Sequence, residues 1–142
     1  MSEVDVQELE NQRSRNEGQQ SDIQDDIDDI DERIDALKAA YKILDDEKEK
    51  ARDYKKIVNG MPGVYSDMWK GEKANQVYDT CENDGALSNT YKEYIDAIDS
   101  IEDSINDEIT RLKNSRSDKW GILQGLIEAW RNLTNRIHNA VN

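Results

Sequence analysis

Paired carboxylates are the most frequent arrangement in this sequence that could do acid–base chemistry. Neighbouring aspartates occur as Asp25–Asp26, Asp28–Asp29 and Asp45–Asp46. Catalysis by two carboxyl groups requires burial or a nearby charge that separates their pKa values. These pairs alternate with single apolar residues at helical spacing, so we expect them on solvated helix faces. The stretch also lacks the glycine and terminal glutamate of an EF-hand loop, and no calcium site is predicted.

Cysteine and histidine chemistry is equally restricted, because Cys81 and His138 are the only residues of their types. A single cysteine cannot form an internal disulfide, and one cysteine with one histidine does not make a zinc site. The sequence shows no third residue that would orient the two as a nucleophile and its base. We therefore expect no enzymatic activity, no metal and no cofactor. Cys81 is interpreted as a small apolar residue on a helix face.

Composition disfavours two classes of partner. The chain of 142 residues has 32 acidic and 19 basic side chains, and the formal charge is -13. Such a field repels nucleic acid and anionic lipid headgroups. The N-terminal segment lacks the basic start and apolar stretch of a signal peptide, and no run of apolar residues is long enough for a membrane span. Membrane insertion is not expected, and export would need a route other than the general secretory one.

The elements that must carry any function are amphipathic helices. From Ile23 to Val58 the apolar residues recur in alternating steps of four and three, interrupted at Lys48 and Lys55. The apolar positions are Ile23, Ile27, Ile30, Ile34, Leu37, Tyr41, Leu44, Ala51 and Val58. This heptad seam predicts a helix that pairs with another helix. Capping-box spacing of Ser21 and Gln24 predicts a helix over residues 21–58 after a polar segment, 1–20, although the seam also extends backwards to Leu9.

Pro62, between Gly60 and Gly63, predicts a turn over residues 59–71, since these residues interrupt helical hydrogen bonding and periodicity. A second helix is predicted over residues 72–113, with a break near Gly85 left open. A third helix is predicted over residues 117–140. Its apolar stripe would leave a large patch in water, so we predict that it contacts a partner. The stripe contains Trp120, Leu123, Ile127, Trp130 and Ile137.

The predicted fold is therefore all-α. One domain, residues 1–142, would form an elongated, antiparallel, coiled-coil-like helical hairpin with an additional C-terminal amphipathic helix. A narrow apolar stripe on a single helix cannot be buried by that helix alone. The sequence thus predicts helix pairing, first within the chain and then with another protein.

The predicted turn ends in Trp69-Lys70-Gly71. A large aromatic residue and a nearby glycine lie here between two long amphipathic helices. On this motif and the hairpin, the sequence resembles the W-x-G helical hairpin superfamily of type VII secretion, and it is most similar to the longer YwqH-like proteins associated with LXG toxins. The resemblance covers about residues 21–113.

The resemblance implies a function without catalysis. The chain would be a partner or targeting factor that binds the helical N-terminal region of an LXG-type toxin and promotes its export by a type VII secretion system. Other small W-x-G-like proteins and the secretion machinery are further expected partners, and Trp69 with Gly71 would form the export motif. The resemblance implies the bacterial cytoplasm as the location, with the chain's own export to the cell surface or medium left open.

Members of this superfamily often carry a Tyr-x-x-x-Asp/Glu export signal. Tyr78 with Glu82 has that spacing, and so does Tyr41 with Asp45. The composition produces about this many matches by chance, so both are weak candidates. Tyr41 is explained as a seam residue, and Tyr78 with Glu82 as an ordinary pair on adjacent helical turns.

A different class of function fits the same pattern. The chain could be a homodimeric coiled-coil spacer or scaffold, in which Trp69 is only an apolar plug at the end of the hairpin. A leucine would serve equally well as a plug, whereas a recognition residue would not tolerate the exchange. The response to that substitution therefore distinguishes the two hypotheses.

Overall fold

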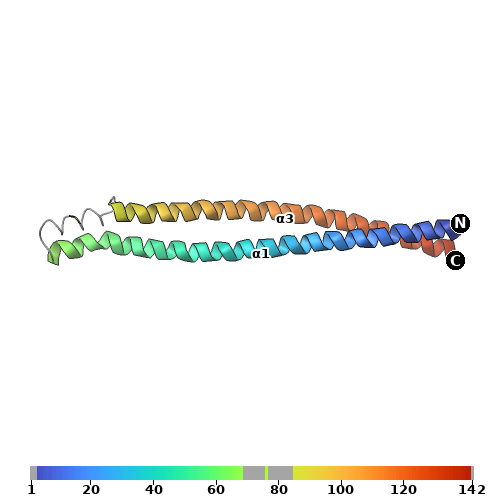
Figure 1. The fold of residues 1–142 in the computed structure, drawn as a ribbon, viewed down its shortest axis with the longest axis horizontal. Coiled ribbons are helices and arrows are strands. Elements are labelled where there is room, and N and C mark those ends of the chain that lie inside the picture. Colours follow the sequence, from blue (N-terminus) through green and yellow to red (C-terminus); the bar gives the residue numbers. More distant parts are fainter. Residues whose placement is uncertain (1–2, 69–75, 77–84, 142) are drawn as a thin grey trace. The chain divides into compact units, whose positions relative to one another are not determined.

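Two long helices make up nearly all of the described chain. The computed structural model describes residues 3–68, 76 and 85–141. Within them, α1 covers Glu3–Met68 and α3 covers Ala86–Val141 (Figure 1). The described residues contain no strand. The predicted all-α fold, with two long helices packed against each other as a hairpin, is confirmed.

The contacts between the helices fall into two compact units. The first unit contains Met1–Ala36 and Ile109–Asn142, and the second unit contains Leu37–Glu108. Both helices contribute to both units, so each unit is an antiparallel pair of helical segments. The seam predicted from the heptad spacing supplies most of the buried side chains in each.

The first unit buries isoleucine and leucine along the facing sides of both helices. The Asn16 side-chain amide donates a hydrogen bond of 2.8 Å to the Leu126 carbonyl, and the Arg116 guanidinium donates one of 2.6 Å to Asp31. Rising numbers on α1 meet falling numbers on α3, which defines an antiparallel pair. The buried apolar residues are Leu9, Ile27, Ile30, Ile34, Ile109, Leu112, Leu123 and Ile137.

The second unit has a thinner apolar seam. Its buried apolar residues are Ala51, Val58, Ile98 and Ile105. The rings of Tyr54 and Tyr91 lie with their centroids 6.2 Å apart and extend the contact between the helices. Burial of an aliphatic side chain contributes about 1.5–3 kcal/mol, so this short seam alone provides modest stabilisation. Polar residues at seam positions therefore matter more here than in the first unit.

The predicted start of the first helix at residue 21 is wrong, because α1 already begins at Glu3. The backward extension of the seam gives the reason. Leu9 and Asn16 are buried at seam positions, with exposed fractions of 4% and 6%. These contacts stabilise the N-terminal turns, and a capping box at Ser21 is not needed to start the helix.

The predicted end of this helix at residue 58 is also wrong. Helix α1 continues past Gly60 and Pro62 to Met68, which shortens the predicted turn of residues 59–71 from its N-terminal side. A proline removes one backbone hydrogen bond, but the turns on either side of it can keep theirs. Residues 69–71 lie outside the described residues.

The C-terminal amphipathic segment is a continuation of α3 and not a separate helix, so the predicted boundary between residues 113 and 117 is wrong. The sequence suggested a break there because apolar periodicity lapses. Arg116 and Lys119 occupy those seam positions and form ion pairs with Asp31 and Asp26 of α1. Their aliphatic stems cover the seam while their charged ends reach α1, so the helix continues without apolar residues.

The N-terminus of α3 agrees with the weak point noted in the sequence. Gly85 directly precedes Ala86, the first residue of α3, and the Asn89 amide donates a 2.9 Å hydrogen bond to the Gly85 carbonyl. The start of the second helix at residue 72, predicted from the sequence, lies outside the described residues.

Candidate protein-binding site

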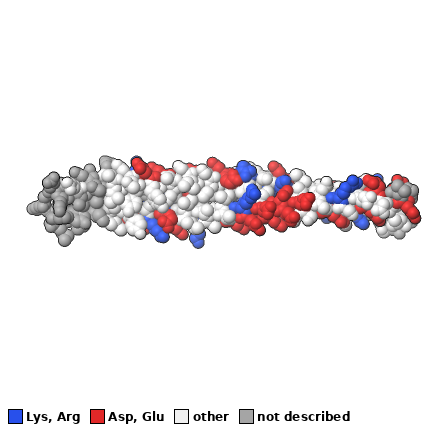
Figure 2. Space-filling model, in the orientation of Figure 1, with Lys and Arg blue, Asp and Glu red and all other residues white. Residues whose placement is uncertain are grey.

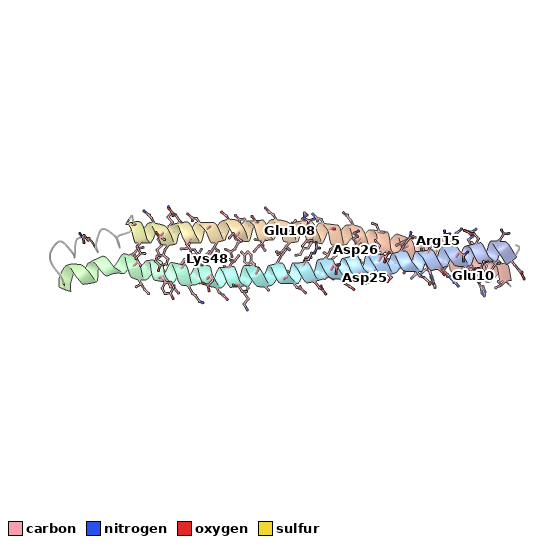
Figure 3. The ribbon with its side chains drawn as sticks, viewed as in Figure 1. Glu10, Arg15, Asp25, Asp26, Lys48 and Glu108 are labelled. Carbon is pink, nitrogen blue, oxygen red and sulfur yellow. The ribbon has the colours of Figure 1, made fainter. Side chains whose placement is uncertain are left out.

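The aspartate pairs lie where solvent reaches them. Asp25, Asp28 and Asp29 are exposed, whereas Asp26 is half-buried and its Oδ2 lies 3.3 Å from the Lys119 ammonium (Figure 3). In the described ranges, no three histidine, cysteine, aspartate or glutamate side chains come together as a metal site. These carboxylates serve as a solvated surface and as partners for basic residues of α3.

An ion cluster around Lys48 replaces apolar packing in the seam of the second unit. The Lys48 ammonium lies on the side of α1 that faces α3 (Figure 3), and it donates hydrogen bonds of 2.5 Å to Glu102 and 2.9 Å to Asp99. The Glu102 side chain is only 3% exposed. These bonds, chiefly the one to Glu102, raise the pKa of the Lys48 ammonium above its ordinary value. The Lys48 side chain is thus held in its charged form at the seam of the second unit.

The sequence pattern did not predict Glu102 as a seam residue, because it assigned Ile101 to that position. Both residues continue the alternation of three and four steps from Ile98, and hydrophobicity favoured the isoleucine. In the structure Ile101 is 49% exposed and Glu102 is buried. The signal that could have identified Glu102 is the lysine at seam position 48, since a buried charge requires an opposite charge.

The stripe predicted to contact a partner lies against α1 in the first unit. Leu123 and Ile137 are buried, and the other members, Trp120, Ile127 and Trp130, are half-buried. The Arg116 guanidinium lies 5.7 Å from the ring centroid of Trp120, which is a cation–π distance. A partner could therefore reach only the outer parts of this stripe.

The outer part of Trp130 borders an open depression of about 430 Å³, lined by Glu17, Gln20, Ile127, Trp130 and Arg131. The Trp130 indole donates a 2.9 Å hydrogen bond to the Glu17 carboxylate on α1. Trp130 thus joins the two helices of the first unit whether or not a partner covers it.

Replacing Trp130 with aspartate is expected to lower the free energy of unfolding by roughly 1–3 kcal/mol, because a half-buried aromatic and its hydrogen bond are lost. Thermal unfolding followed by circular dichroism measures the effect. Ile122→Asp is the control, since Ile122 lies on the same helix and is 50% exposed. Equal stability of the two variants would show that Trp130 contributes nothing to the hairpin.

The motif residues predicted between the helices are Trp69, Gly71, Tyr78 and Glu82, and they lie outside the described residues, as does Cys81. Tyr41, from the other weak export-signal candidate, is half-buried at its seam position. The export motif therefore remains a prediction from the sequence.

The second unit carries a set of exposed apolar side chains that the sequence pattern did not reveal. Each of them directly precedes a seam residue. They are Ile43, Tyr54 and Ile57 on α1 and Tyr94 and Ile101 on α3, with exposed fractions between 48% and 64%. We call them the apolar row. The face of the second unit displayed in Figure 2 is mostly uncharged, with acidic and basic residues towards its edges.

A comparison with known families places this hairpin among its relatives. The model of the YwqH-like family matches residues 11–124, which is more than half of the chain. The chain belongs to the YwqH-like family. The match includes the whole second unit with its apolar row, and it ends before Trp130 and Ile137. No curated protein and no solved structure matched the chain significantly.

Neither helix of this YwqH-like chain, over the residues that the structure describes, contains a segment that is both long and apolar enough to cross a bilayer.

Proposed function

We propose that this YwqH-like chain is a non-catalytic targeting partner. It binds the helical N-terminal region of an LXG-type toxin and promotes export of that toxin by a type VII secretion system. The observation that supports this proposal best is the apolar row on a hairpin of this family, because exposed apolar side chains at helical spacing suit the docking of another helix.

Binding would work by completing a helical bundle. A helix of the toxin would cover side chains that the hairpin leaves in water, and it would thereby gain the apolar contacts that an isolated amphipathic helix lacks. Trp69 and Gly71 would then be presented to the secretion machinery as the export motif. This role places the chain in the bacterial cytoplasm before export.

Co-expression tests the first step. The full chain and the N-terminal helical region of an LXG-type toxin from the same genomic neighbourhood are expected to co-purify and to elute as one complex from a size-exclusion column. The C-terminal toxic region of the same protein is the control and should elute separately.

The alternative function, a homodimeric spacer, predicts a different result. The chain would then elute as a dimer with or without the toxin region, and the toxin region would not shift its position. That outcome would contradict the targeting proposal.

A further inference from the structure

The apolar row lies on a single face of the second unit. In an α-helix, the residue before a seam residue is rotated by about 100° to one side of it. The two helices run in opposite directions, so this side is the same for α1 and α3. Ile43, Tyr54 and Ile57 therefore share a face with Tyr94 and Ile101. The same face also carries the charged residues Glu47, Lys50 and Glu108, of which Glu47 and Lys50 neutralise each other in an ion pair of 3.2 Å and Glu108 is half-buried.

The opposite face of the same unit is hydrophilic. Its positions directly follow the seam residues. On α1 these are Lys38, Lys42, Asp45, Glu49, Arg52 and Lys56, and on α3 they are Asn89, Lys92, Asp96, Asp99, Asp103 and Asn106. One face of the second unit is thus apolar and the other is charged or amide-bearing. A pair of helices needs apolar residues only at the two seam positions of each heptad. A third apolar position in the heptad is typical of a helix that also packs against further neighbours.

Acidic side chains border the apolar face. Asp46 and Asp53 on α1 each come one residue before a position of this face, about 100° further round the helix, and Glu93 and Asp107 lie at the corresponding positions on α3. All four side chains are exposed. We call them the acidic rim. A helix that docks between the rims meets apolar contacts at its centre and negative charge on both sides.

The acidic rim disfavours a second copy of this chain as the occupant. A face-to-face dimer would bring acidic rim against acidic rim in a protein whose net charge is -13.

We propose that the apolar face of the second unit is the docking site for an amphipathic helix of another protein whose apolar stripe is bordered by lysine or arginine. This inference rests on the proposed function and specifies the surface and the chemistry of the partner. The apolar row contributes the buried contacts, and the acidic rim selects basic flanks and raises the rate of encounter.

Two synthetic helical peptides of about 21 residues test this chemistry. Both carry the same leucine stripe, one flanked by lysine and the other by glutamate. Fluorescence anisotropy of the labelled peptides with the full chain is expected to show at least tenfold tighter binding of the lysine-flanked peptide. Equal binding of the two peptides would overturn the role of the acidic rim and with it the proposed partner chemistry.

Matched isoleucine variants locate the site. Ile101→Asp and, on the other helix, Ile43→Asp should each weaken binding of the lysine-flanked peptide at least tenfold. Ile122→Asp should change it less than twofold, although Ile122 also precedes a seam residue of α3 and is equally exposed, at 50% against 49%. A loss of similar size with Ile122→Asp would overturn the assignment of the face. Unchanged circular dichroism confirms that the variants are folded.

Sedimentation and co-purification separate the remaining outcomes. A wild-type chain that sediments as a dimer, and becomes monomeric with Ile101→Asp, would show that a second copy occupies this face and would overturn the proposal. If the Ile101→Asp variant loses the peptide but still co-purifies with the toxin region, the proposed function stands and this docking site is wrong. If the toxin region fails to bind even the wild-type chain, the proposed function fails, while the peptide result still decides the chemistry of the face.

Discussion

Replacing Trp69 with alanine is expected to abolish export of the partner toxin from a host with an active type VII system, while the hairpin and its complex with the toxin remain. The described contacts that hold α1 to α3 lie within residues 9–58 and 88–137, so this substitution removes none of them. A tryptophan at the centre of a recognition contact, in contrast, can supply much of the binding energy, and its loss there typically costs at least 2 kcal/mol, or about 30-fold in affinity.

Secretion is measured by immunoblotting of culture medium and cell lysate, and the complex by co-purification. Trp69→Leu is the discriminating variant, because leucine preserves an apolar plug but not an aromatic contact. Export should fail in both variants, with unchanged helicity and unchanged co-purification. Normal export of Trp69→Leu, or unfolding of Trp69→Ala, would favour the plug and contradict a targeting role.

Heptad spacing predicted the paired helices because it reports directly on which residues face a partner helix. Ile27, Ile30 and Ile34 were expected in the seam and are buried, with exposed fractions of 8% or less. The fold class needed no other information. The boundaries were predicted poorly because each was inferred from a local interruption, at Ser21, at Pro62 or near Ser115, and contacts with the facing helix continue through two of these interruptions.

The candidate binding surface could not be predicted for a related reason. The stripe with Trp120 and Trp130 appeared unpartnered because the sequence suggested a separate third helix. Once that segment continues α3, α1 covers it. The apolar row was overlooked because Ile43, Tyr54 and Ile57 are separated by charged residues, and only the orientation of two antiparallel helices brings them onto one face with Tyr94 and Ile101.

The ion cluster at Lys48 gives the second prediction with a large effect. Replacing Lys48 with methionine leaves the Glu102 carboxylate, which is 3% exposed, without its cation. The second Glu102 oxygen already has no hydrogen-bond partner in the described part of the chain. Removing one member of a buried ion pair is strongly destabilising, so the melting temperature is expected to fall on the order of 5–10 °C.

Two further variants distinguish the loss of the Lys48–Glu102 ion pair from the loss of one positive charge elsewhere on the chain. Lys50→Met removes a lysine whose side chain is 63% exposed and whose ion pair with Glu47 lies at the surface, so the melting temperature should change by about 1 °C or less. The double variant Lys48→Met with Glu102→Leu should regain most of the lost stability, since two apolar residues replace the pair. A Lys48→Met variant as stable as the wild type would show that the ion cluster contributes nothing to the stability of the hairpin.

The stabilisation that Lys48 contributes is expected to decrease at high pH. Hydrogen bonds to Glu102 and Asp99 raise the pKa of Lys48 above the ordinary value of 10.5, so the folded state holds this proton more tightly than the unfolded state. The stabilisation is complete below that ordinary value and is lost as the pH rises through the higher pKa of the folded state. The difference in unfolding free energy between the wild type and Lys48→Met should therefore stay constant from pH 7 to about 9. A difference that already disappears in this range would contradict the assignment.

The same pair fixes how the helices align, which links its stability to the proposed binding face. A slip of α1 along α3 by one heptad would place Lys48 opposite Ile95 or Ile109 and leave two charges buried without partners. The apolar row depends on this alignment, because its members on α1 and α3 must lie at the same level to form one face. Lys48→Met with Glu102→Leu should thus restore stability without restoring a unique alignment, and it should bind the lysine-flanked peptide more weakly than the wild type. Wild-type affinity in this double variant would show that apolar packing alone sets the register.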